Sequence, residues 1–311
     1  MTSQRVGYAI LIILALVAPA FAYPVFLMKA LCFALFACAF NLLLGYAGLM
    51  SFGHAMFFGM AGYFYGHAVK AWDMPPEIGL LVGVAGAAAL GLVTGALAIR
   101  RQGIYFAMIT LAFAQMVYFF CVQAPFTGGE DGLQGIPRKS LFGIIPTKDD
   151  LVLYYVVLAI FLFGYGAIYR FIHSPFGQVL KAIRDNEQRA VSLGYEADRY
   201  KLLAFVLSAA LAGLAGATKA MVQQFATLTD VAASTSGEVV LMALVGGLGT
   251  IVGPVVGAFI IVTMQNYLAG FGQFVLVIQG AIFVVIVLAF RKGVVGEFAE
   301  WWRRRRTASS R

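Results

Sequence analysis

Charged side chains are scarce in this sequence, and their scarcity excludes an ordinary soluble domain. Only 12% of the 311 residues are charged, whereas 61% are hydrophobic and the mean hydropathy is +0.88. This is far more apolar surface than one soluble core can bury, so a bilayer is the expected solvent. The sequence therefore predicts an all-α, polytopic membrane protein with a single transmembrane domain over residues 1–311.

Residue patterns for catalysis and metal binding are also missing. The three cysteines, Cys32, Cys38 and Cys121, lie in apolar stretches, which indicates buried thiols rather than a disulfide framework or a metal site. The sequence has no Walker-type phosphate loop, no zinc-ligand pair on a helix and no nucleophile elbow. We therefore expect that the chain is not an enzyme and uses no cofactor or metal.

The sequence also has few of the residues that ion-coupled transport usually requires. A proton- or sodium-coupled carrier usually needs carboxylates inside the membrane, and Glu238, at the edge of one apolar interval, is almost the only candidate. A channel would more often show a repeated filter or rings of charge. We therefore expect a partner to supply the energy for transport, with a self-contained channel or facilitator as the alternative.

Long apolar intervals are what the sequence has in abundance. A hydrocarbon core of roughly 30 Å needs about 20 apolar residues per helix. Full spans are expected at about 6–28, 30–46, 49–69, 78–99, 104–123, 151–171, 202–222 and 273–290. The first interval is also similar to a secretory signal with a small-residue cleavage site near Ala22, and that alternative stays open.

Basic residues orient these spans, because Lys and Arg are retained on the cytoplasmic side. The basic groups at 100–101, 170–201 and 291–311 are all expected in the cytoplasm, which leaves residues 124–150 outside. Both termini are then cytoplasmic. The arginines of the tail follow two tryptophans, so we interpret them as an anchor at the membrane lipid and not as a nucleic-acid site.

Two glycine-rich stretches interrupt the helical pattern. Residues 239–266 are too long for one straight span and too short for two, and GGLGTIVGP at 246–254 places four glycines and a proline in the middle. Eight full spans with a re-entrant pair are expected, or ten if both limbs cross the membrane. The second stretch, 41–64, is expected to break in the region 45–54.

Broken helices expose polar backbone groups near substrate paths in transporters. We therefore expect the path to run beside both breaks. The candidate residues are Asn41, Gly45, Ser51, Phe52, Gly53, His54, Gly246, Gly247 and Gly249. Helix packing is the alternative explanation for the glycines, above all Gly59 and Gly62. A hydrogen-bonded structural role is favoured for His54 over a titrating one.

Nine charged side chains are concentrated between Lys181 and Lys201, five of them basic and four acidic. Ser174-Pro175 favours the start of a helix and Gly194 its end. The apolar residues Phe176, Val179, Leu180, Ile183, Ala190 and Leu193 recur between them at helical spacing. The pattern predicts one amphipathic cytoplasmic helix over 176–193 that docks into another protein. The alternative is a solvated or lipid-skimming loop helix.

Four blocks of sequence occur in order along most of the chain: NLLLGYAGLMSFGHAMFFGMAGY, TGGEDGL, GQVLKAIRDNEQRAVSLGYEADRYKLLAFVLSAALAGLAGA and GGLGTIVGPVVGAFI. They resemble the LivM-type permease subunit of branched-chain amino acid ABC transporters. The resemblance implies a bacterial inner-membrane permease that pairs with a LivH-like subunit, two cytoplasmic ABC ATPases and a periplasmic or lipid-anchored binding protein. Related permeases serve urea, short amides or aromatic acids, and those substrates stay open as alternatives.

The resemblance also implies roles for two loops. ABC permeases carry Glu-Ala-Ala, three residues and Gly in a cytoplasmic loop; Ala190 and Gly194 match this pattern, whereas Gln188 and Arg189 depart from it. The residues expected to couple to the ATPases, in the loop at about 173–200, are Arg184, Asp185, Glu187, Ala190 and Gly194. Those expected to dock the binding protein, unless this is an ordinary solvated turn, are Thr127, Gly128, Gly129, Glu130 and Asp131.

Overall fold

The computed structural model describes residues 15–143, 145–268, 270, 277–278, 280–281, 283–284, 288 and 293–297. Within these residues the named elements are all helical. The expected span at 273–290 and the basic tail at 291–311 lie largely outside the described residues, as does the first part of the span expected at 6–28.

The long helices of the bundle match the apolar intervals of the sequence. They are α2 (Pro24–Asn41), α3 (His54–Lys70), α4 (Pro76–Ala98), α5 (Ile104–Gln123), α6 (Asp150–Ile172), α9 (Ala197–Gln223), α10 (Ala233–Gly246) and α11 (Gly253–Leu268). Two short helices, α7 (Pro175–Asp185) and α8 (Glu187–Ser192), join α6 to α9. Among the described residues, five helices are long and apolar enough to cross a membrane. The chain is therefore a multi-pass membrane protein.

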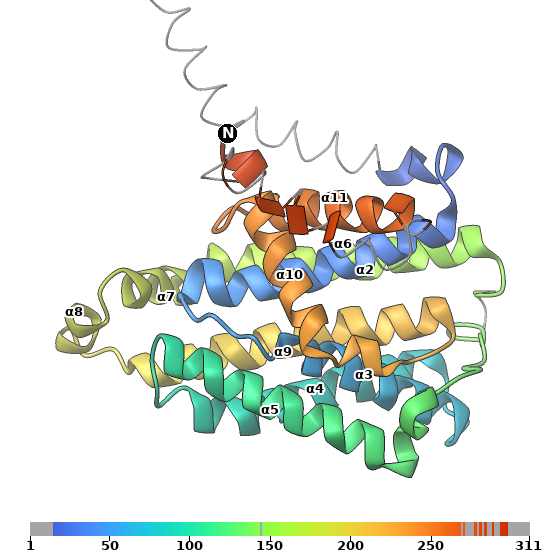
Figure 1. The fold of residues 1–311 in the computed structure, drawn as a ribbon, viewed down its shortest axis with the longest axis horizontal. Coiled ribbons are helices and arrows are strands. Elements are labelled where there is room, and N and C mark those ends of the chain that lie inside the picture. Colours follow the sequence, from blue (N-terminus) through green and yellow to red (C-terminus); the bar gives the residue numbers. More distant parts are fainter. Residues whose placement is uncertain are drawn as a thin grey trace, which may run out of the picture.

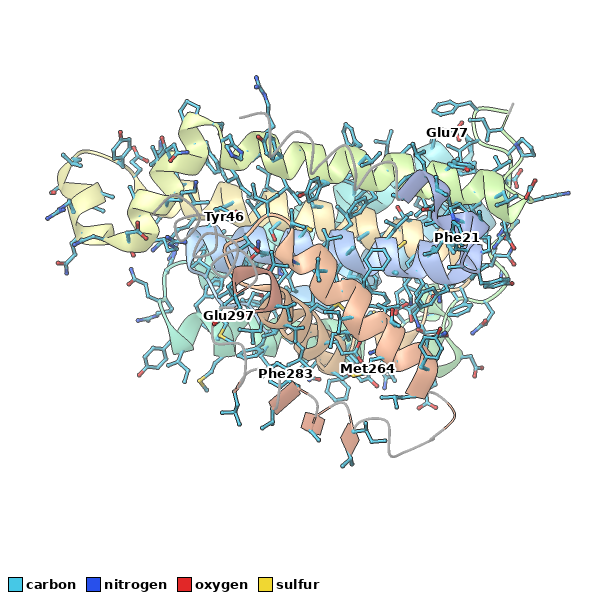
Figure 2. The ribbon with its side chains drawn as sticks, turned by 90° about the horizontal axis from the view of Figure 1, so that it is seen from above. Phe21, Tyr46, Glu77, Met264, Phe283 and Glu297 are labelled. Atoms are coloured by element: carbon cyan, nitrogen blue, oxygen red, sulfur yellow. The ribbon has the colours of Figure 1, made fainter. Side chains whose placement is uncertain are left out.

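The helices run roughly along one axis, with α7 and α8 at one end of the bundle and the connection between α5 and α6 at the other (Figure 1). We call these the α7 end and the α5–α6 loop end. Figure 2 shows Phe21 and Glu77 near the α5–α6 loop end and Tyr46 toward the α7 end. The predicted orientation makes the α7 end cytoplasmic.

Helix α2 lies at the centre of the bundle and α5 at its periphery. In the most apolar stretch of residues Pro24–Ala47, 89% of the residues are buried, whereas the value for α5 is 28%. Large apolar side chains such as Ile104, Met108 and Phe119 stay exposed on α5. In a membrane protein such a face is expected to contact lipid.

Small residues bring α3, α4 and α9 into close contact. A Cβ atom added to Gly216 of α9 would lie 1.8 Å from the carbonyl oxygen of Phe58 in α3, so only glycine fits there. Gly59 is packed as tightly, because an added Cβ would lie 2.3 Å from Cγ2 of Val231. Gly59 is therefore a packing residue, but its neighbour is the segment formed by Asp230 and Val231 and not a second long helix.

The structure corrects the boundary between the first two expected spans. A continuous helix over 6–28 is wrong, because a 3₁₀ turn at Ala18–Ala20 is followed by Tyr23 in extended conformation, and α2 starts at Pro24. Proline fits the first turn of a helix but disrupts its interior. Lys29 therefore lies inside α2 instead of separating two spans.

The break expected within residues 239–266 is confirmed. Helices α10 and α11 have 14 and 16 residues and are separated by residues 247–252. At 1.5 Å per residue they are about 21 and 24 Å long, shorter than a hydrocarbon core of roughly 30 Å. These lengths favour the re-entrant pair. The turn of this hairpin lies toward the α7 end (Figure 1).

Candidate functional site

The two breaks meet at the side chain of Asn41, the last residue of α2. Asn41 is 3% exposed, and its Nδ2 donates to the carbonyl oxygen of Thr250 at 2.9 Å. Its Oδ1 accepts a hydrogen bond from the backbone nitrogen of Gly249 at 3.0 Å. One amide side chain therefore satisfies a donor and an acceptor that the α10–α11 break leaves free, which a broken helix in a membrane requires.

Gly45 makes this contact possible because it carries no side chain. It lies in the π-helical turns Leu42–Ala47 that extend α2. A Cβ atom on Gly45 would lie 2.5 Å from Oδ1 of Asn41 and 2.8 Å from the nitrogen of Gly249. Gly249 itself has a φ of +72°, a conformation that favours glycine. Both glycines, predicted as path residues, thus belong to one junction with Asn41.

The turn between α10 and α11 is held by a hydroxyl group that the sequence reasoning missed. Oγ1 of Thr250 donates to the carbonyl oxygen of Gly247 at 2.8 Å and accepts from the nitrogen of Gly253 at 3.1 Å. Gly246 packs on Gly253, because an added Cβ would lie 1.9 Å from its carbonyl oxygen. A threonine within a glycine-rich break, where hydroxyl groups often bind free backbone groups, was the available signal.

Helix α7 contacts the first break directly. Nη1 of Arg184 donates to the carbonyl oxygen of Gly45 at 2.6 Å, and Nη2 pairs with Oδ1 of Asp185 at 2.8 Å. The aliphatic part of Arg184 covers Gly48, where an added Cβ would lie 2.8 Å from Cγ. Arg184, predicted to couple to a partner, therefore also reaches the junction around Asn41, and Asp185, predicted for the same role, pairs with its guanidinium group.

A single amphipathic helix over 176–193 is not what the structure shows, and this prediction is wrong. The chain leaves α7 at Asn186, whose φ of −159° is extended, and α8 begins at the next residue. Oδ1 of Asn186 accepts a hydrogen bond from the nitrogen of Arg189 at 3.0 Å. Asparagine is a favourable N-cap, so it starts a second helix instead of continuing the first. The end at Gly194 is confirmed, since this residue has a φ of +90°.

The predicted apolar stripe is also only partly right. Ala190 is 3% exposed and packs with Ile183 and Ala197 in a small core that joins α7, α8 and α9. Leu193, assigned to the same stripe, is instead 71% exposed at the C-cap of α8. The apolar surface that this loop offers to a partner is therefore at Leu193 and not at Ala190.

Glu187, another predicted coupling residue, is engaged within the chain. Its Oε1 pairs with Nζ of Lys201 at 2.6 Å, and the side chain of Lys201 is only 4% exposed. The pair ties the start of α8 to α9, and removal of either partner would leave the other charge partly buried and uncompensated.

The second half of the first break lies against other helices. The backbone nitrogen of Phe52 donates to Oγ1 of Thr110 at 3.2 Å, and a Cβ on Gly53 would lie 2.1 Å from the carbonyl oxygen of the same residue. Ser51 is fully buried and its Oγ accepts from the nitrogen of Gly53 at 3.4 Å. Phe52 and Gly53 therefore pack on Thr110 of α5, with Ser51 beside them. They are not part of the junction formed by Asn41, Gly45 and Gly249.

His54 is enclosed and hydrogen-bonded. Its Nε2 lies 2.9 Å from Oγ of Ser208, which donates its only proton to the carbonyl oxygen of Ala39 at 2.5 Å. Nε2 of His54 must then be the donor. The rings of Phe40 and Phe57 lie 5.5 and 5.4 Å from the imidazole. This geometry fits the structural role favoured from the sequence.

The outer loop predicted to dock a binding protein is held to the end of α9. Thr127 is buried and donates to the carbonyl oxygen of Ala124 at 2.8 Å, whereas Glu130 and Asp131 are exposed. Gly128 and Gly129, the other two predicted docking residues, have φ values of +80° and +63°. Leu133 and Ala226 then form an isolated β-bridge that fixes the loop beside residues 224–232.

Comparisons with known proteins agree with the membrane fold. The family model described as branched-chain amino acid transport system / permease component matches residues 25–288. The high-affinity branched-chain amino acid transport system permease protein LivM of Escherichia coli (strain K12) is 28% identical over 277 residues, 82% of this chain and 63% of that protein. The ribose import permease protein RbsC of Bacillus subtilis (strain 168) is 32% identical over 179 residues, 53% of this chain and 51% of that protein.

The name of a third relative refers to a different transported molecule. The autoinducer 2 import system permease protein LsrC of Klebsiella pneumoniae is 30% identical over 159 residues, 47% of this chain and 43% of that protein. The chain spans 63% of the length of the two LivM relatives that it matches over 277 residues. No solved structure matches the chain.

Proposed function

Because the chain belongs to the family of branched-chain amino acid transport system permease components, we propose that it is a permease subunit of an ATP-driven ABC importer. In this proposal it contributes part of the translocation path for branched-chain amino acids and hydrolyses no ATP itself. Its partners are a LivH-like permease subunit, two cytoplasmic ATPases and a substrate-binding protein. It lies in the bacterial inner membrane with both termini and the α7 end in the cytoplasm.

One observation carries this proposal: the loop of α7 and α8 is connected to both breaks through hydrogen bonds. Arg184 reaches the carbonyl oxygen of Gly45, and Asn41 beside it holds the nitrogen of Gly249. Motion imposed on α7 by an ATPase can therefore reach the α10–α11 break through three adjacent residues. Such a connection is what a transporter driven by a cytoplasmic partner needs.

We place the translocation path beside the two helix breaks for a physical reason. An amphiphilic solute needs polar partners inside the membrane, and broken helices offer backbone groups without adding fixed charge. The 247–252 turn supplies such groups at the junction, where Asn41 already binds two of them. The names of other relatives include ribose and autoinducer 2 importers, so the fold serves more than one kind of solute, and urea, short amides and aromatic acids remain the alternative substrates.

Reconstitution in proteoliposomes tests the proposal. Uptake of labelled leucine is expected only when the chain is combined with its second permease subunit, the ATPases, the binding protein and ATP. Uptake by the chain alone would contradict the proposal and indicate a self-contained channel.

A variant of the α7 contact tests the observation itself. Arg184→Met removes the bond to Gly45, and we expect the ATPases to co-purify while binding protein no longer stimulates ATP hydrolysis. Arg199→Met is the matched control, because Arg199 is a surface residue whose ion pair within the described residues is with the neighbouring exposed Glu196. Equal stimulation of hydrolysis in both variants would show that the bond does not transmit motion.

A further inference from the structure

Helix α3 begins inside the protein, at the buried His54, with no cap from the residue that precedes it. That residue is Gly53, which has no side chain to accept a hydrogen bond from the free N–H groups of the first turn. A larger residue does not fit there, because an added Cβ would lie 2.1 Å from the carbonyl oxygen of Thr110. The close packing of Gly53 on α5 therefore requires an acceptor from elsewhere in the fold.

A hydroxyl group of α10 supplies such an acceptor. The backbone nitrogen of Ala55, the second residue of α3, donates to Oγ of Ser236 at 2.9 Å, and the two residues are 181 positions apart in the sequence. Both residues are fully buried. In most helices the serine that makes this bond directly precedes the first turn. Here α10 provides the cap of α3, so the start of α3 is fixed relative to α10.

The same hairpin is bonded to the other side of the first break. At the turn that follows α10, the backbone nitrogen of Gly249 donates to Oδ1 of Asn41, the last residue of α2. Ser236 lies ten residues before Gly246, the last residue of α10, which is about 15 Å along the helix and half of a hydrocarbon core of roughly 30 Å. Helix α10 therefore bridges the break, with one bond to the helix before it and one to the helix after it.

A close backbone approach supports the bond at Ser236. Gly59 lies one turn after Ala55 on the same face of α3. A Cβ atom on Gly59 would lie 2.3 Å from Cγ2 of Val231 and 2.8 Å from the carbonyl carbon of Asp230. Val231 is fully buried in this contact. The glycine thus lets the chain that leads into α10 lie directly against α3, within reach of the serine hydroxyl.

We propose that Ser236 is a positioning residue that joins the re-entrant hairpin to α3, so that α10 and the start of α3 move together during transport. The inference rests on the proposed function, in which motion of α7 reaches the α10–α11 turn through Gly45 and Asn41. A helix passes a displacement of its end along its length, and the buried bond at Ser236 passes it to α3. The predicted path residues Ser51 and Gly53 are then displaced with the hairpin. Ser236 acts through α3 and not by contact with the solute.

The amount of solute taken up per ATP hydrolysed tests this role. In proteoliposomes with all partners, Ser236→Ala leaves the N–H of Ala55 without its acceptor, and we expect leucine uptake per ATP to fall about fivefold or more. Hydrolysis stimulated by the binding protein should persist, because the bond between Arg184 and Gly45 is unchanged. Ser236→Thr keeps the hydroxyl group and should retain most of the wild-type ratio. A merely structural role would lower the amount of assembled complex and leave the ratio unchanged.

Thr94→Val is the matched control. The Thr94 hydroxyl is also buried, but it donates to the carbonyl oxygen of Leu90 in its own helix, so its loss disconnects no two helices. A wild-type ratio of uptake to hydrolysis in Ser236→Ala would overturn the inference. Equal loss in Ser236→Ala and Ser236→Thr would assign the effect to packing and would overturn it as well. Absence of ATP-driven uptake by the wild-type importer would overturn the proposed function and this inference with it.

Discussion

Asn41 shows how one residue lets two helix breaks share their polar groups. The amide has a donor and an acceptor, and here each faces a backbone group of the other break, at Thr250 and Gly249. An aliphatic side chain would leave both groups unpaired at a cost of about 1–3 kcal/mol each. The residue identity at this position therefore follows from the requirements of the break and not from helix propensity.

A second test at the level of single residues concerns Gly45. In Gly45→Ala the new methyl group would lie 2.5 Å from Oδ1 of Asn41, and forcing it in should cost about 1–3 kcal/mol of stability. We expect a lower Tm of the purified complex together with reduced transport. Gly166→Ala is the matched control, because nothing lies within 4 Å of its Cβ position and alanine favours a helix by about 1 kcal/mol. Equal Tm values for the two variants would contradict the close approach at Gly45.

At the scale of elements, the split between α7 and α8 changes which side chains can meet a partner. The predicted continuous helix had Ala190 and Leu193 in one apolar stripe, whereas in α8, which starts after the cap at Asn186, Ala190 is enclosed and Leu193 is 71% exposed. The two helices thus separate two tasks. Helix α7 holds the first break through Arg184, and α8 presents an apolar surface.

Leu193→Arg tests this separation. The substitution lies on an exposed surface, so insertion and stability should change by no more than about 0.5 kcal/mol. Co-purification of the ATPases should nevertheless be lost, because the apolar contact is replaced by a charge. Ala190→Arg should behave differently, since it buries a charge in the core of the loop at a cost of about 3 kcal/mol or more. Full retention of the ATPases by Leu193→Arg would assign the docking surface elsewhere.

The whole molecule has an orientation that labelling can measure. Cys32, Cys38 and Cys121 are buried, so the wild-type chain should react little with an impermeant maleimide. In right-side-out vesicles, Asp149→Cys should be labelled at once and Arg199→Cys only after permeabilisation, because the basic loops are retained in the cytoplasm. Labelling of both positions from one side would overturn the topology.

Several features of the fold could be predicted because their signals are local. Glycine and proline in GGLGTIVGP indicate a break wherever the segment lies, and Gly194 ends its helix by adopting positive φ. The start of α2 was missed although Pro24 marks it, because the apolar run from residue 6 to 28 hid the signal. The split at Asn186 was missed for a similar reason, since apolar spacing alone does not report an N-cap.

By itself, the sequence determined three properties: that this protein is a membrane protein, at which residues its helices break, and which of its loops are basic. Each of these properties depends on composition or on neighbours within a few turns. Only the tertiary structure decided that Asn41 bonds to Gly249, which is 208 positions away in the sequence. The same is true of the bond between Arg184 and Gly45, which are 139 positions apart. Such partners depend on how the helices pack, and packing is set by the surfaces of all of them together.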